Sequence, residues 1–160
     1  MPRSARLIID NSIHHVMTRG NQKQKTFLNS SDYQKYIEIL KHYKNKFWFK
    51  LFGYCLMPNH VHLIIKIRKG RNLQKIIQGL NQTYTIWFNK KYSKVGHLWQ
   101  GRYKDMLLQN NNYLINCIEY VEFNPVRAKL IKEPSSYLWS SCSSRMEIKN
   151  DGLLNVIEIS

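Results

Sequence analysis

The alternation of apolar and polar residues divides the chain into short strands and longer amphipathic helices. Apolar runs and period-two alternation predict strands over residues 12–18, 48–57, 60–67 and 102–109. Apolar residues at three- and four-residue spacing predict helices from Ser31 to Phe47, from Leu73 to about Tyr92 and from Asn110 to about Asn124. The last helix is expected to end there because proline at 125 disfavours helical geometry in the residue before it.

Polar residues at the helix starts predict the caps. Ser31-Asp32-Tyr33-Gln34 has the pattern of a capping box, Asn72 is the candidate cap of the second helix, and the asparagines at 110–112 offer caps for the third. The chain after Val126 is less periodic. We expect a short helical piece, a loop around residues 134–136 and a frayed C-terminus after about Arg145.

The order of elements is strand, helix, strand, strand, helix, strand, helix. Two βαβ halves of this kind generally build a four-stranded antiparallel sheet with two helices on one face, the ferredoxin-like arrangement. We therefore predict one α+β domain over residues 1–160, with a core at about 8–130 and a C-terminal extension at about 131–160. Strands one and three should be neighbours, which would bring His14 or His15 near the histidines of strand three. The second sheet face would be left for the third helix and a ligand.

The charge balance favours a polyanionic partner. The chain has 25 Lys and Arg against 10 Asp and Glu, a net charge of +15 spread along its length. Nucleic acid is the natural partner, because each neutralised phosphate releases condensed counterions. A basic surface that serves only solubility and binding to an anionic membrane are the alternatives, although no long basic amphipathic helix is evident. The scattered Cys55, Cys117 and Cys142 and the short apolar run at residues 7–9 predict a cytoplasmic protein with reduced thiols and no membrane span.

His60 and His62 open an apolar strand directly after the Pro58-Asn59 turn signal. Because the side-chain period of a strand is two, both imidazoles should lie on one face, where they could hold one metal ion. A chance His-x-His in a basic protein is the alternative, and Cys55 together with the pair would be a zinc alternative.

Two neighbouring stripes run along the third predicted helix. One is apolar and should pack on the sheet: Leu114, Ile118 and Val121. The other carries ligating or reactive groups at offsets of four, seven and eleven: Tyr113, Cys117, Tyr120 and Asn124. If this second stripe faces the histidines, a phenol and an amide oxygen would lie beside the metal. An ordinary half-buried tyrosine and an ordinary helix-terminal asparagine are the alternatives.

Several segments together resemble the single-tyrosine HUH transposases of the IS200/IS605 type, in particular their REP-associated branch. They are Pro2 to Arg6, His14-His15-Val16 with Arg19-Gly20-Asn21, Tyr54 to Ile65, Gly96 to Tyr103, Tyr120 to Ala128 and Trp139-Ser140-Ser141. Their order and spacing along the chain make the set specific.

The resemblance implies a nuclease and strand transferase (transposase) that acts on single-stranded DNA near a hairpin. His60 and His62 would then hold Mg²⁺ or Mn²⁺, with Asn124 at the place where relatives put a third polar ligand, often Gln. Tyr120 would be the nucleophile, and its attack would leave a covalent 5′-phosphotyrosine and a free 3′-OH. A second 3′-OH could reverse that step and join strands.

Further residues are candidates for DNA binding. Arg3 and Arg6 could grip a groove or phosphates, and His14 or His15 could position the scissile phosphate. Trp99 could stack on an unpaired base or plug the core. The other candidates are Arg19, Arg102, Lys104 and Arg127, and solvated surface cations are the alternative for the arginines and lysine.

Two other functions stay open at this stage. One is a catalytically inactive, domesticated module that binds hairpin DNA, and the other is a metal-dependent nuclease that uses water and forms no adduct. The choice between monomer and homodimer is also open.

Overall fold

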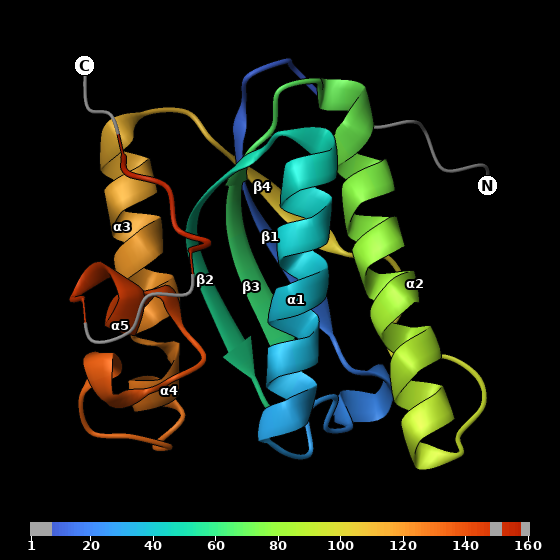
Figure 1. Ribbon diagram of the computed structural model, residues 1–160. Helices are drawn as coiled ribbons and strands as arrows, with labels where there is room; N and C mark the ends of the chain where they lie inside the picture. The colour runs from blue at the N-terminus through green and yellow to red at the C-terminus, as the bar shows by residue number, and fades with distance from the viewer. Residues whose placement is uncertain (1–7, 148–151, 158–160) are drawn as a thin grey trace.

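Four strands form one antiparallel sheet in the computed structural model, which describes residues 8–147 and 152–157 (Figure 1). The strands are β1 (Ile13–Arg19), β2 (Lys50–Met57), β3 (His60–Lys66) and β4 (Lys104–Leu108). Their order is β2-β3-β1-β4, and every neighbouring pair is antiparallel. This confirms the predicted α+β ferredoxin-like fold with strands one and three at the centre.

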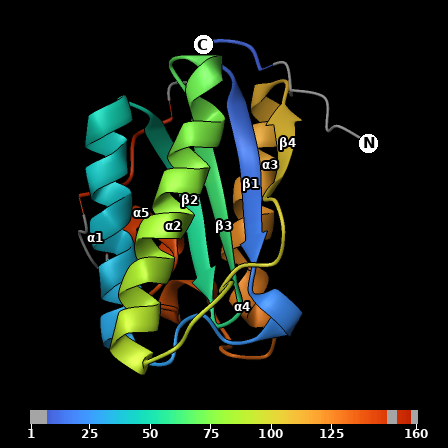
Figure 2. The same cartoon turned by 90° about the vertical axis from the view of Figure 1, so that its right-hand side faces the viewer.

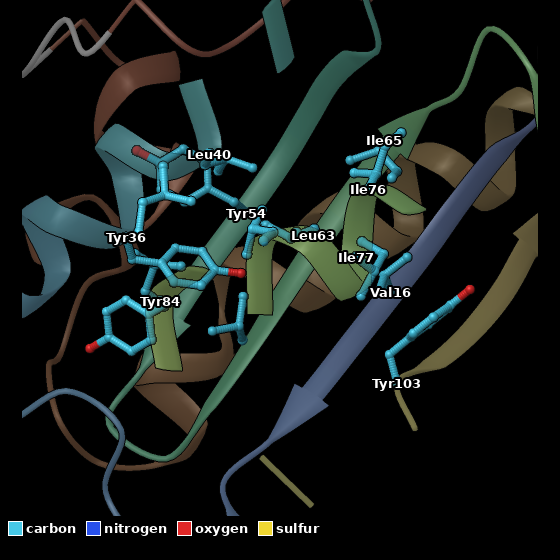
Figure 3. Packing of buried hydrophobic residues seen from close by; sticks show 14 of the residues in the cluster. Val16, Tyr36, Leu40, Tyr54, Leu63, Ile65, Ile76, Ile77, Tyr84 and Tyr103 are labelled. Carbon is cyan, nitrogen blue, oxygen red and sulfur yellow. The ribbon is translucent and has the colours of Figure 1, made fainter. Parts of the chain in front are cut away.

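Two long helices cover one face of this sheet, as Figure 2 shows. They are α1 (Ser30–Phe47) and α2 (Leu73–Tyr92), each with an apolar stripe at helical spacing. The stripes pack with the alternate strand residues that face them, among them Val16, Leu63 and Ile65 (Figure 3). The main core therefore lies between these helices and the sheet.

A smaller layer covers the other face. It consists of α3 (Asn111–Glu122), α4 (Asn124–Arg127) and α5 (Ser141–Arg145), grouped on one side of the sheet in Figure 1. Three short 3₁₀ turns complete the described elements: Asn21–Lys23, Gly70–Asn72 and Pro134–Ser136. None of the helices in the described ranges is long and apolar enough to cross a membrane.

Two of the predicted helix caps are wrong. Helix α1 is capped by Asn29, whose side chain accepts from the Asp32 backbone N–H, so Ser31 already lies inside the helix. Asn72 makes no side-chain cap, because the preceding 3₁₀ turn gives it a helical backbone. Asn110 does cap α3, by accepting from the Tyr113 N–H at 3.0 Å.

The C-terminal extension is not frayed throughout. Leu153 is fully buried in the main core, and its carbonyl accepts from Lys44 Nζ at 2.6 Å. Asn155 hydrogen-bonds to both backbone groups of Leu51, so this segment covers part of the outer edge of β2. The expectation of a frayed end is wrong for residues 152–157, because one buried leucine and the hydrogen bonds beside it anchor this short non-periodic segment.

Candidate active site

The two histidines of β3 point to the face that carries α3. Arg19 lies directly opposite His60 in the sheet, and Met17 and Cys55 flank His62 on the two neighbouring strands. The rings of His60 and His62 are 5.0 Å apart between centroids. The prediction that both imidazoles share one face is confirmed.

Hydrogen bonds fix the orientation of both rings. Nδ1 of His60 is 2.7 Å from Asn59 Oδ1, and Nδ1 of His62 is 2.8 Å from His15 Nε2. Because Asn59 Oδ1 can only accept, His60 donates from Nδ1. His62 Nε2 accepts from the Asn124 amide at 2.7 Å, so His62 also carries its proton on Nδ1. Each ring therefore keeps an Nε2 lone pair, the form that ligates metals.

Both imidazoles are held neutral. Burial lowers the pKa of His60 to about 4, with a smaller contribution from the Arg19 guanidinium. Burial also lowers the pKa of His62 strongly, and the neighbouring His15, His60 and Arg127 act in the same direction. Since metal binding requires the neutral imidazole, these shifts favour ligation near neutral pH.

Tyr120 lies beside the histidines of its own chain. Its ring centroid is 6.4 Å from that of His62 and 6.4 Å from that of His15, and the side chain is 53% exposed. Arg127 stacks over the ring at 4.1 Å and donates to the Tyr120 carbonyl. The phenol is thus oriented by a cation and open to solvent.

The buried face of α3 sets that position. Leu114, Ile118 and Val121 pack on the sheet as predicted, and Gly53 of β2 lies under the helix, where an added Cβ would be in ordinary van der Waals contact with Ile118 Cγ1 at 3.6 Å. Cys117 belongs to this apolar face, so its placement in the functional stripe is wrong.

Tyr113 lies seven residues before Tyr120, about 10 Å along the helix axis. It is 58% exposed. Of the two tyrosines, only Tyr120 has a described ring contact with the histidines.

Asn124 reaches His62 because the chain bends before it. Helix α3 ends at Glu122, and Asn124 begins α4 with Pro125 at the next position. A network that the sequence did not reveal secures this end of α3: buried Glu122 accepts from Ser141 Oγ at 2.7 Å and pairs with Arg145 at 3.0 Å. The sequence signal that could have revealed this network is the acidic Glu122 on the apolar face of the predicted helix.

The donor set for a metal is two imidazoles and one carboxamide. Within residues 8–147 and 152–157, no group of three or more His, Cys, Asp or Glu side chains is arranged to hold a metal ion. Cys55 is fully buried beside His62 among apolar side chains, and it does not complete such a group, which argues against the zinc alternative.

The predicted DNA-binding residues separate into two groups. Lys104 lies opposite Met17, in the same cross-strand row as His62, so Arg19, Lys104 and Arg127 surround the site. His15 faces the site as well. Arg3 and Arg6 lie outside the described residues.

Three candidates lie on the other side of the sheet. His14 is 4% exposed and bonds to Asp105 and Ser12, and burial lowers its pKa despite the Asp105 carboxylate. His14 therefore cannot position the scissile phosphate. The sequence left His14 and His15 as alternatives for this role, and His14 is the wrong one. Trp99 is 8% exposed and packs on Tyr84, so its ring is no stacking platform. Arg102 lies near Trp99 and away from the site.

The fold and the site together define a class of protein: a ferredoxin-like domain that presents two neutral histidines and a carboxamide to a tyrosine of the same chain. Residues 9–124 match the family model described as Transposase IS200 like. The chain belongs to this family, as its sequence motifs predicted.

A sequence relative supports the same REP-associated branch of the family as the motifs do. A Haemophilus influenzae protein named as a REP-associated tyrosine transposase is 26% identical over 117 residues, which cover 66% of this chain. The matched region is 64% of the length of that relative.

Two solved structures share the fold. A REP-associated tyrosine transposase bound to a REP hairpin has a TM-score of 0.77 at 17% identity, over 97% of this chain and 89% of that one. A Deinococcus radiodurans R1 protein named as a transposase has a TM-score of 0.52 at 13% identity, over 76% of this chain and 96% of that one.

Proposed function

We propose that this protein is a metal-dependent endonuclease and strand transferase that cuts single-stranded DNA near a hairpin through Tyr120. The observation that carries the proposal is the placement of the Tyr120 ring 6.4 Å from His62 within one chain. The family match and the hairpin bound by the structural neighbour support the choice of substrate.

His60, His62 and Asn124 fit a divalent cation. Both histidines offer a neutral Nε2, and the Asn124 carboxamide can present its oxygen once its amide turns toward a cation. When bound, Mg²⁺ or Mn²⁺ would polarise the scissile phosphate and offset the charge that develops on it. Because histidine is a softer ligand than Mg²⁺ prefers, Mn²⁺ should serve at least as well.

Tyr120 would supply the nucleophile. Its Oη forms a bond to phosphorus while the bond to the 3′-oxygen breaks, and the departing oxygen takes up a proton as a free 3′-OH. The phenol proton passes to solvent, which reaches this half-exposed side chain. The energy of the phosphodiester is kept in the phosphotyrosine, so a second 3′-OH can reverse the step.

The basic side chains around the site would hold the strand. Arg19 and Lys104 flank the histidine face, and Arg127 lies on the Tyr120 ring, where its charge is near the reacting phosphate. The histidines themselves add no positive charge near neutral pH. The net charge of +15 supports binding to the rest of the DNA backbone.

The test compares two tyrosines of α3. Labelled DNA hairpins with single-stranded flanks are incubated with protein and Mn²⁺ or Mg²⁺, and protein-linked DNA is measured on a denaturing gel. We expect Tyr120→Phe to abolish the adduct and Tyr113→Phe to retain it. Cleavage without an adduct would favour attack by water, and salt-sensitive binding without cleavage would favour a binding module.

A further inference from the structure

A buried acidic residue lies at the end of the helix that carries the proposed nucleophile. Glu122 is the last residue of α3, two positions after Tyr120 and two before Asn124. Its side chain is buried, whereas Tyr120 is half-exposed. Because successive residues of a helix are turned by about 100°, these two side chains lie on nearly opposite sides of α3. Glu122 therefore holds the inner side of the helix end whose outer side presents Tyr120.

Three donors from α5 converge on one oxygen of the Glu122 carboxylate. Oε1 accepts from Ser141 Oγ at 2.7 Å, from Arg145 Nε at 3.1 Å and from Arg145 Nη2 at 3.0 Å. Hydrogen bonds are directional, and those of a carboxylate with a guanidinium are among the stronger ones. The apolar stripe of α3 also holds the helix on the sheet, but burial of apolar surface has no preferred direction. The carboxylate is therefore the group that fixes how this helix end is turned and how far along its axis it lies.

The same two donor residues are bonded to the backbone of β2. Ser141 Oγ accepts from the Tyr54 N–H at 2.9 Å. Arg145 Nη2 donates to the Phe52 carbonyl at 2.6 Å. Tyr54 lies opposite the residue that follows His62 in β3. The network therefore ties the end of α3 to the sheet beside the strand that carries both histidines.

We propose that Glu122 is a positioning residue for DNA cleavage. Its bonds to Ser141 and Arg145 set the rotation and the axial position of α3. They thereby set where Tyr120 and Asn124 stand relative to the two histidines. A displacement of a reacting group by about 1 Å can cost on the order of a hundredfold in rate. The inference rests on the proposed function, because it takes Tyr120 as the nucleophile and Asn124 as a metal ligand.

The test compares two substitutions of Glu122. Glu122→Met keeps the length of the side chain but removes its acceptors, whereas Glu122→Gln keeps an acceptor oxygen for the α5 donors. Single-turnover adduct formation is measured at saturating hairpin DNA and Mn²⁺, at a temperature where circular dichroism shows each variant to be folded. We expect Glu122→Met to lower the rate constant by about tenfold or more, and Glu122→Gln to stay within about threefold of the wild type. A role in stability alone would leave the rate constant of the folded variants unchanged.

Two serines of α5 provide a matched pair of variants. Ser141→Ala removes a donor to Glu122 and should slow adduct formation by about threefold or more. Ser143→Ala removes an equally buried hydroxyl, which donates to the Ser140 carbonyl at 3.1 Å, and should leave the rate constant unchanged. Ile39→Ala lowers stability from the main core on the other face of the sheet and should also leave the rate constant unchanged.

A titration with Mn²⁺ in the absence of DNA gives a readout that does not depend on cleavage. Because Glu122 also holds the chain that leads to Asn124, Glu122→Met should weaken Mn²⁺ binding by about threefold or more. If wild-type protein forms the adduct and folded Glu122→Met does so with a normal rate constant, the positioning role is overturned and the Tyr120 mechanism stands. If wild-type protein forms no adduct, the Tyr120 mechanism is overturned, and equal Mn²⁺ affinities of the two proteins would then overturn the positioning role as well.

Discussion

The side-chain amide of Asn124 lies 2.7 Å from Nε2 of His62, although 62 positions separate the two residues in the sequence. This contact places a third polar group at the lone pair that a metal would use. It follows from the short helix α4, which begins at Asn124 and turns the chain toward β3.

Asn124→Ala should weaken binding of Mn²⁺ by about tenfold or more, because it removes the one carboxamide of the donor set. Isothermal titration calorimetry with Mn²⁺ measures the effect. Asn112→Ala, at an exposed position near the start of α3, is the matched control and should bind Mn²⁺ like the wild type. Equal affinities for Asn124→Ala and wild type would show that Asn124 is not a ligand.

His15 should act as a positioning residue for His62. Its Nε2 holds the proton of His62 on Nδ1, and loss of such an outer partner typically costs about 10- to 100-fold in metal affinity. We expect His15→Phe to show this loss in the same titration, and His15→Gln to restore part of it through its amide oxygen. If His15→Phe binds Mn²⁺ normally, the orientation of His62 does not depend on this contact.

Arg127 should affect the rate of adduct formation more than DNA binding. Its guanidinium stacks on the Tyr120 ring at 4.1 Å, a contact worth about 0.5–1 kcal/mol at an exposed site. Arg127→Met should therefore slow single-turnover adduct formation at saturating DNA by about twofold to fivefold. Lys129→Met, which removes an exposed charge nearby, should weaken binding and leave that rate unchanged.

The pair between Glu122 and Arg145 should stabilise the fold. Glu122 is 6% exposed and also accepts from Ser141, so Glu122→Ala leaves buried partners unsatisfied. We expect a loss of about 2 kcal/mol in the free energy of unfolding, less than for a fully buried pair because Arg145 is partly exposed. Urea unfolding of Glu122→Ala against the exposed control Glu119→Ala tests this, and equal midpoints would contradict it.

Stability should fall as the pH drops from about 6.5 toward 4. Burial lowers the pKa values of His60, His62, His15 and His14 below their usual 6.5, to about 4 for His60. In this window the unfolded chain binds more protons than the folded one, so acidification favours unfolding.

Titration of Asp32 does not contribute to the loss of stability in this pH range. Burial would raise the pKa of its carboxyl, but hydrogen bonds from Lys91 and Tyr92 outweigh that effect and lower it, so its contribution is lost only below about pH 4.

Melting temperatures of wild type and His62→Gln between pH 7 and 4.5 measure the loss of stability caused by the histidines. If the melting temperature of His62→Gln falls with decreasing pH as steeply as that of the wild type, His62 does not contribute to the pH dependence of stability.

The local periodicity of the sequence determined the order of the elements and the face on which His60 and His62 lie. Helical spacing likewise predicted the buried stripe of α3. These features depend on near neighbours in the chain, for which the period of a strand or a helix fixes the direction of each side chain.

Only the tertiary structure decided which residues meet. The register between β1 and β3 selected His15 for the site and sent His14 to the opposite face, and the packing of α3 moved Cys117 into the core. It also buried the Trp99 ring in the main core. Such choices depend on register and on contacts between distant segments, and a one-residue shift in a strand reverses them.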